Sequence, residues 1–298
     1  RDAIASFSCP GQNLIFASKS GDIAITQQGT FPAKWKYQGE FLMDGKDSTY
    51  EWQGMIPAEQ MLTMKNPKRG FVSSANQLPT DPIGYPYYLG GDYIYERGYR
   101  INSILRGLRK ATVQDMMNLQ NDNFNTRAHQ ILPLIFETLD SMSLSGEEKE
   151  WLKVLENWDK LNDAESEGAT IYQTLMDSLE YNIWGDELRK SVIGVMPEHN
   201  TIVQDLMKNT NFKCVDNIFT PQKETFADQL KTSFVSILPA LNQMKKENKL
   251  RWGLHKGTCI PHLIDVKQNM TSLSRLELNV GGGEGIVNAT KKSHGPSW

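Results

Sequence analysis

The sequence predicts an α+β protein in which a large, mainly helical segment is inserted between segments of β character. Three zones along the 298 residues lead to this prediction. Residues 1–90 are rich in glycine, proline, aromatic and β-branched residues, which is typical of strands and loops. Residues 91–250 repeat apolar side chains at helical spacing, and residues 251–298 return to β character. We therefore expect one sheet within a single domain spanning residues 1–298, not two independent domains.

The first zone predicts a hairpin, a long loop and a further strand. Residues 13–26 contain two apolar and β-branched runs around a turn with Gly21, whose missing side chain permits a positive φ. Proline, glycine and tryptophan interrupt residues 31–67, so we expect a long ordered loop there. Residues 69–76 then predict a strand that ends at Asn76.

The second zone predicts several amphipathic helices. Thr112 fits the N-cap of a short helix, and Ser145 with Glu148 forms a capping box ahead of Trp151. Pro239 lies inside the last helical pattern, where its missing N–H is expected to kink or interrupt the helix. The predicted helices cover residues 94–108, 112–119, 145–155, 170–188 and 223–245.

The third zone predicts two strands around a glycine-rich turn. Residues 274–280 alternate apolar and polar side chains, and β-branched residues return at 286–290. The intervening Gly281-Gly282-Gly283 lacks the Gly-Lys-Ser/Thr ending of a phosphate loop, and no helix start follows it. A flexible hairpin turn is therefore favoured over a phosphate site.

Charge and hydropathy exclude two classes of partner. With 32 basic and 35 acidic residues the net charge is -3, so the sequence has no basic patch for nucleic acid or an anionic membrane surface. No stretch reaches the roughly 18 apolar residues of a membrane span. We therefore expect neither nucleic acid nor a membrane as a partner.

The cysteines and histidines match no metal-binding pattern. Cys9, Cys214 and Cys259 fit neither a zinc spacing nor a CxxC motif, which leaves open one disulfide with a free thiol or three thiols. His255 and His262 lack supporting ligands at suitable spacing, so hydrogen-bonded structural histidines are the favoured interpretation. We expect no metal at these positions.

A local nucleophile motif is also missing from the sequence. There is no Gly-x-Ser-x-Gly elbow, and no Ser-x-x-Lys with its partner motifs. The sequence begins at Arg1 without methionine and ends at Trp298 shortly after a glycine-rich stretch, so we expect a piece of a longer protein. If that protein is a hydrolase, its nucleophile is expected upstream of Arg1.

The most specific signal is a set of short motifs in a fixed order, each of them weak alone. The set includes Asn13-Leu14-Ile15-Phe16-Ala17-Ser18, Gly29-Thr30-Phe31-Pro32, Trp52-Gln53-Gly54-Met55-Ile56-Pro57, Gly70-Phe71-Val72-Ser73-Ser74-Ala75-Asn76 and Tyr99-Arg100-Ile101. This ordered set resembles the penicillin amidase (penicillin acylase) family of N-terminal-nucleophile hydrolases. The resemblance implies part of a four-layer αββα sandwich, in a fragment of the catalytic large (beta) subunit of an amidohydrolase.

The resemblance also implies roles for three residues. Asn76 matches the family's oxyanion-hole asparagine, and a neutral amide can donate to an oxyanion without adding a titrating charge. Arg100 matches an arginine that supports the site by hydrogen bonding near this asparagine. Gln12 matches a position that can line the acyl pocket, where its polar side chain departs from the apolar type of phenylacetyl-selective members.

Further expectations follow from the same resemblance. The precursor is expected to be a zymogen that cleaves itself, and the new N-terminal serine then acts as the nucleophile. The expected partners are a small N-acylated amide, such as an acylated antibiotic, and the missing N-terminal part or small subunit of the precursor. No cofactor is required, although family members often hold a structural calcium ion, which we assign to no residue here.

The expected location is periplasmic or extracellular, by family resemblance only. If the protein is an enzyme, it could be an acyl-homoserine-lactone acylase or a cephalosporin-type acylase instead of a penicillin acylase. The alternative from another class is a non-catalytic binding protein that has kept the fold.

Overall fold

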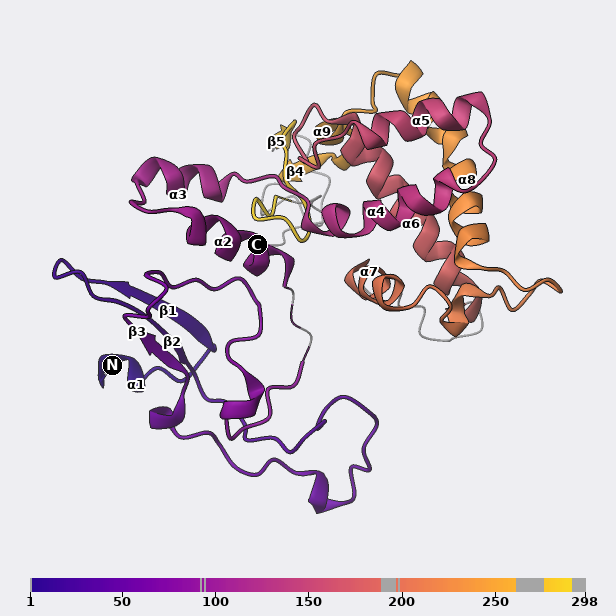
Figure 1. Cartoon of the computed structure of the whole chain (residues 1–298). Coiled ribbons are helices and arrows are strands. Elements are labelled where there is room, and N and C mark those ends of the chain that lie inside the picture. The colour runs from indigo at the N-terminus through magenta and orange to yellow at the C-terminus, as the bar shows by residue number, and fades with distance from the viewer. Residues whose placement is uncertain are drawn as a thin grey trace, which may run out of the picture. The chain divides into compact units, whose positions relative to one another are not determined.

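The chain folds into two compact units, Arg1–Thr112 and Val113–Trp298 (Figure 1). The computed structural model describes residues 2–91, 93, 95–188, 197, 199–260 and 276–290. The first unit contains a small sheet and a helix, and the second is mainly helical. Each unit is described by itself.

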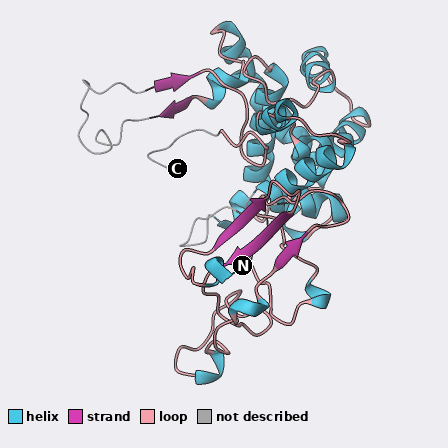
Figure 2. Cartoon of the chain, turned by 90° about the vertical axis from the view of Figure 1, so that its left-hand side faces the viewer, coloured by secondary structure: helices cyan, strands magenta, loops and turns pink. Residues whose placement is uncertain are grey.

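An antiparallel three-stranded sheet organises the first unit, with its strands side by side in Figure 2. Its strands are β1 (Gln12–Ala17), β2 (Ile23–Gln28) and β3 (Thr63–Lys65), in the order β1-β2-β3. The predicted hairpin is confirmed, and Gly21 in its turn has a φ of 92°. β3 lies inside the predicted loop, so that prediction is wrong over these three residues.

The other elements of the first unit are short, apart from one helix. They are α1 (Asp2–Ala5), the 3-10 turns η1 (Ser48–Tyr50), η2 (Ala58–Gln60) and η3 (Pro82–Gly84), and helix α2 (Glu96–Gly107). α2 confirms the predicted helix over 94–108. The segment 31–60 is largely irregular apart from η1 and η2, as the sequence predicts.

Residues 69–76 do not form the predicted strand, although their apolar and β-branched residues suggested one. The segment is irregular and ends in a bend at residues 75–77. The side chain of Gln77 replaces strand pairing there, because its Oε1 accepts the N–H of Ala75 at 2.6 Å and its Nε2 donates to Ser73 O at 3.4 Å. Local side-chain hydrogen bonds thus compete successfully with a β ladder.

The second unit is a helical assembly. Figure 1 shows α4, α5, α6 and α8 gathered together, and α6 packs most extensively on α8. Its elements are α3 (Val113–Gln120), α4 (Thr126–Asp140), α5 (Gly146–Glu156), α6 (Glu167–Leu188), α7 (His199–Lys208), η4 (Lys213–Val215), α8 (Phe226–Lys246) and α9 (Trp252–Lys256). The predicted helices at 112–119, 145–155, 170–188 and 223–245 are therefore confirmed as α3, α5, α6 and α8.

Two local signals in these helices can be compared with the structure. The predicted capping box is present, because Ser145 Oγ accepts the N–H of Glu148 and the Glu148 carboxylate accepts the N–H of Ser145. Pro239 does not interrupt α8, which continues to Lys246. Leu238 and Leu241 on either side of this region are buried, so tertiary packing outweighs the local cost of the proline.

The hydrophobic core described for the chain lies in the second unit. It joins side chains of α4, α5, α6, α7 and α8 and of the segments that follow them. Its largest fully buried side chains include Phe234, Ile131, Leu132, Ile135, Leu139, Leu155, Ile171, Leu175, Leu179 and Ile183. In the first unit, by contrast, Ile15 and Phe16 on β1 are 59% and 56% exposed.

A second, separate sheet follows the helices. β4 (Thr258–Ile260) pairs antiparallel with β5 (Leu276–Leu278), which lies within the predicted strand 274–280. The described strands therefore fall into two sheets, and they do not form the single sheet that the order of zones suggested. A pattern of side chains predicts strands but contains no information on which strands pair across a long helical segment.

The glycine-rich segment is a packed structural element and no hairpin turn. Gly282 has a φ of 82° and donates its N–H to Asn162 O at 2.9 Å, while its carbonyl accepts the indole N–H of Trp252 at 2.7 Å. Buried Lys256 donates to the carbonyls of Gly281 and Thr290 at 2.5 and 2.7 Å. Residues 286–290 form no strand, so that prediction is wrong.

The structure also answers the question that the cysteines left open. All three are free thiols, with Cys9 exposed and Cys214 and Cys259 partly buried. His262 lies outside the described residues. Over the ranges given above, none of the helices is long and apolar enough to cross a membrane.

Candidate functional site

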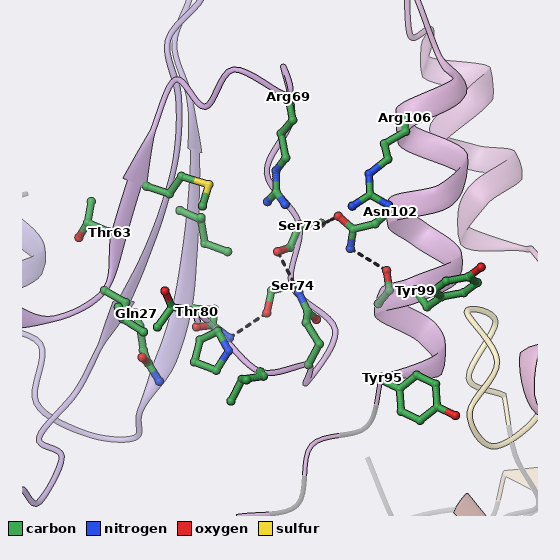
Figure 3. Close-up of a pocket in the computed structure, with 18 residues that line it drawn as sticks. Gln27, Thr63, Arg69, Ser73, Ser74, Thr80, Tyr95, Tyr99, Asn102 and Arg106 are labelled. Carbon is green, nitrogen blue, oxygen red and sulfur yellow. Dashed lines mark hydrogen bonds between the residues drawn. The ribbon is translucent and has the colours of Figure 1, made fainter. Parts of the chain in front are cut away.

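The first unit contains a cavity of about 430 Å³ whose lining comes from three parts of the unit. The sheet supplies Asn13, Ile25, Gln27, Thr63 and Met64. The segment 69–80 supplies Arg69, Ser73, Ser74, Gln77, Leu78, Pro79 and Thr80. Helix α2 supplies Gly98, Tyr99, Asn102 and Arg106, and Leu62 and Tyr95, which directly precede β3 and α2, also line the cavity. Figure 3 shows the segment with Ser73 and Ser74 running between the sheet and α2.

Hydrogen bonds hold this segment on both sides. Asn13 Nδ2 on β1 donates to Ser74 Oγ at 2.8 Å, and Ser73 Oγ donates to Asn102 Oδ1 on α2 at 3.2 Å (Figure 3). Asn102 is fixed in turn, because its Nδ2 donates to Gly98 O at 2.6 Å. The segment is therefore attached to both the sheet and the helix just before Asn76.

Gly98 allows α2 to approach the segment closely. A Cβ on Gly98 would lie 3.1 Å from Gln77 Cβ and 3.1 Å from its Oε1, which is tighter than ordinary packing. Gln77 is the side chain that holds the backbone of Ser73 and Ala75. The small residue on α2 thus helps to set the position of the bend that contains Asn76.

Asn76 is exposed and lies in the left-handed backbone region, with a φ of 61°. Asparagine is one of the few non-glycine residues that visit this region at low cost. Its Oδ1 accepts a hydrogen bond from Arg97 Nη2 at 2.5 Å. Because Arg97 binds the oxygen of the amide, the two N–H donors of Nδ2 remain for another acceptor.

This arrangement can stabilise a developing negative charge. A side-chain N–H fixed in direction is a suitable oxyanion donor, because little reorganisation is needed as the charge forms. The guanidinium of Arg97 adds a positive charge that acts in the same direction. The geometry is therefore consistent with the oxyanion role predicted for Asn76, which stays a prediction.

The structure places the other two predicted residues apart from this contact. The guanidinium that donates to Asn76 belongs to Arg97, one helical turn before Arg100 on α2. Gln12 is exposed at the start of β1, opposite Gln28, and is not among the residues that line the cavity. The roles proposed for Arg100 and Gln12 stay predictions.

Sequence reasoning missed Arg97 as a partner of Asn76. Arg97 and Arg100 are three residues apart, and residues at this spacing lie on similar faces of a helix. The pattern therefore could not decide which of them contacts the asparagine. Only the position of the bend at residues 75–77 relative to the start of α2 decides it.

The thiol of Cys214 is not activated as a nucleophile. Burial and the neighbouring Glu187 carboxylate raise the pKa of Cys214 to about 11, which keeps it as a thiol at neutral pH. Among the residues that the structure describes, no three His, Cys, Asp or Glu side chains come together as metal ligands. The carboxylate of Asp81, for example, has a structural role, because it accepts the N–H of Ile83 at 2.9 Å and so caps the 3-10 turn η3.

The chain is similar to acylases in sequence and in fold. An acyl-homoserine lactone acylase, QuiP, of Pseudomonas syringae is 25% identical over 295 residues, which are 91% of this chain and 34% of that protein. Penicillin G acylase of Escherichia coli is 21% identical over 192 residues, which are 62% of this chain and 22% of that protein. The chain thus spans about a third or less of the length of these relatives.

A solved structure shows the same fold. Thermostable penicillin G acylase from Alcaligenes faecalis aligns with a TM-score of 0.61 and 15% identity, over 84% of this chain and 50% of that one. The mixed helix-and-sheet fold is thus that of penicillin G acylase, an N-terminal-nucleophile hydrolase fold. The sequence profile of the penicillin amidase family matches residues 1–298. The chain therefore belongs to the penicillin amidase family.

Proposed function

We propose that the protein containing these residues hydrolyses linear N-acyl amides and releases a carboxylic acid and an amine. The proposal depends mainly on one observation, the Asn76 amide whose oxygen is bound to Arg97 and whose Nδ2 donors are not used in that contact. Family membership supports the reaction type, and the names of the relatives, acyl-homoserine lactone acylase and penicillin G acylase, describe amide hydrolases.

The proposed mechanism uses a nucleophile outside the 298 residues, an N-terminal serine exposed when the precursor cleaves itself. Its own α-amine accepts the hydroxyl proton, since an α-amine titrates near neutrality. The serine oxygen adds to the amide carbonyl, and the resulting oxyanion accepts a hydrogen bond from Asn76 Nδ2. The C–N bond then breaks, the proton passes to the leaving amine, and water hydrolyses the acyl-enzyme.

The partner of this chain would be the remaining part of the same precursor. β1 is an edge strand whose six residues are exposed except for the partly buried Leu14. Ile15 and Phe16 point to opposite faces of the sheet and both are exposed, so each face has an uncovered apolar side chain at this edge, which is typical of an edge that another segment covers. The chain spans only about a third of the length of its relative QuiP. We therefore propose that the remaining part of the protein covers this edge of the sheet. We also propose that the protein is exported to the periplasm or outside the cell.

The test of this function is to trap the acyl-enzyme in the intact, processed parent protein. The parent would be incubated with phenylacetyl, phenoxyacetyl and long-chain acyl amides, and the mass of its subunits would be measured after rapid acid quenching. We expect an increase equal to the acyl group on the subunit whose first residue is the nucleophile. Amide turnover by an assay of the released amine would accompany it.

The alternative is a binding protein that has kept the fold without catalysis. The same experiment separates the two functions, because a binding protein would hold a substrate analogue without an acyl adduct and without released amine. A parent protein whose first processed residue is not serine, threonine or cysteine would also contradict the proposed mechanism.

A further inference from the structure

Among the residues that the structure describes, the lining of the cavity in the first unit contains positive charge and no acidic side chain. Arg69 and Arg106 are the ionisable residues with a formal charge at neutral pH among the described residues that line it. Most of the other lining side chains are neutral and polar, including Ser73 and Asn102. A cavity with this lining has a positive potential that favours an anionic ligand.

Arg69 is oriented by its own segment. Its Nε donates to Phe71 O at 2.9 Å, and its guanidinium carbon lies 4.8 Å from the centre of the Phe71 ring. These contacts use one N–H and one face of the guanidinium. The two terminal amino groups retain donors for a ligand, since arginine has five N–H donors in a planar fork.

Arg106 approaches the cavity from the other side, in the last turn of α2. It forms no hydrogen bond or ion pair with any of the other described residues. Figure 3 shows Arg69 and Arg106 on either side of Ser73, with Asn102 beside Arg106. Two guanidinium groups that line one cavity, with no acidic side chain among the described lining residues, repel each other, and an anion bound in the cavity would reduce that repulsion.

The size and polarity of the cavity narrow the ligand class. A volume of about 430 Å³ is in the range of small-molecule sites. The planar fork of arginine matches a carboxylate in two parallel hydrogen bonds, and Ser73 and Asn102 add neutral polar groups. A long apolar acyl chain would supply neither a counter-charge nor hydrogen-bond acceptors to the two guanidinium groups.

We propose that this cavity binds the carboxylate of a substrate, with Arg69 and Arg106 as the residues that recognise it. This inference rests on the proposed function, because it takes the ligand to be a molecule with a hydrolysable amide. Asn76 does not line the cavity, but its neighbours Ser74 and Gln77 do. The carboxylate subsite therefore adjoins the segment that places the oxyanion donor.

Direct binding to the intact parent protein tests the subsite without any turnover. Calorimetric titration would use adipate as the anionic probe and hexane-1,6-diol as its neutral counterpart of equal chain length. We expect adipate to bind and the diol to bind at least about tenfold more weakly, as for the loss of a charge-assisted hydrogen bond. Equal affinity for the two probes would overturn the proposal.

Matched variants assign the effect to the two arginines. R69Q and R106Q should each weaken adipate binding about tenfold, and R106K should weaken it less because the charge remains but the fork is lost. R109Q is the control, since Arg109 is exposed just beyond α2 and does not line the cavity. Unchanged affinity in R69Q and R106Q, or an equal loss in R109Q, would contradict the assignment. Far-ultraviolet circular dichroism of each variant checks that it is folded.

Substrate kinetics then identify the source of the carboxylate. N-adipoyl-glycinamide has it on the acyl side, N-hexanoyl-glycine on the amine side, and N-hexanoyl-glycinamide on neither. We expect R106Q to raise KM about tenfold for one of the two charged substrates and to leave the neutral one unchanged. An unchanged KM for all three, with turnover intact, would overturn the substrate subsite but not the proposed function. Adipate binding without hydrolysis of any amide would instead contradict the proposed function.

Discussion

Removal of the Asn76 side chain is the sharpest test of the proposed oxyanion donor. Its Oδ1 is bound to Arg97, so the side chain offers its Nδ2 donors to the reacting carbonyl. Loss of one oxyanion-hole donor typically costs about 10²–10³ in kcat, or roughly 2.7–4 kcal/mol of transition-state stabilisation. We therefore expect N76A in the intact, processed parent to lower kcat by about 10²–10³ and to change KM little.

The left-handed backbone of Asn76 needs a matched control. Alanine at a φ of 61° costs about 1–2 kcal/mol of folding stability, whatever the role of the side chain. Asn248 is also exposed, with a φ of 54°, and lies after α8 in the other unit. N248A should therefore show a similar loss of stability in urea unfolding with unchanged kcat.

Two further variants separate donation from orientation. N76D keeps the size of the side chain and can still bind Arg97, but a carboxylate accepts hydrogen bonds and cannot donate, so it should lose as much kcat as N76A. R97Q removes the group that fixes the amide, and we expect about a tenfold loss, roughly 1.4 kcal/mol, because the donor remains but is less well directed. Near-normal turnover in N76A would refute the reasoning. A larger loss in R100Q than in R97Q would instead favour Arg100, the residue that the family resemblance implies.

Three other predictions concern stability and are measured by urea unfolding. F234A should lower the free energy of unfolding by about 3–5 kcal/mol because Phe234 is fully buried. V235A is the control, and because Val235 is 39% exposed it should change this free energy by less than about 1 kcal/mol. Equal effects of the two variants would contradict the assignment of Phe234 to the core. G282A should lose about 2–4 kcal/mol, since its φ is 82° and a Cβ would clash with the carbonyl of Asn288. Burial and the hydrogen bond with Asp186 raise the pKa of Glu187 from 4.5 to about 7, so its contribution to stability is complete below pH 4.5 and is lost as pH rises to about 7. As pH rises from 4.5 to 7, the free energy of unfolding of E187Q should therefore increase relative to that of the unaltered protein. A constant difference between the two across this window would disprove the raised pKa of Glu187.

Local sequence signals predicted the helices well. The capping box at Ser145 and the apolar periodicity of residues 170–188 depend on residues three or four positions apart, so the sequence contains the complete signal. The hairpin around Gly21 is equally local. The order of motifs from Asn13 to Arg100 is also sufficient to indicate the family, and the profile match over residues 1–298 confirms it.

Long-range pairing was decided by the tertiary structure. Residues 69–76 have the composition of a strand, yet the side chain of Gln77 and the close approach of Gly98 hold them in an irregular bend. Gly281-Gly282-Gly283 suggested a flexible turn, but buried contacts with Asn162 and Trp252 fix it. In both places distant side chains satisfy the backbone, and a pattern of neighbouring residues cannot reveal them.

For the candidate site, the sequence by itself indicated the family, which the profile match confirms, and predicted Asn76 as the oxyanion donor, which stays a prediction. The tertiary structure decided that Arg97 is the arginine in contact with it, and that Arg69 and Arg106 face one cavity. The physical reason is the range of the interactions. A helix or a turn is specified by residues within one or two turns of chain, whereas a hydrogen bond across 21 positions, as between Asn76 and Arg97, exists only once the bend and the helix have packed together.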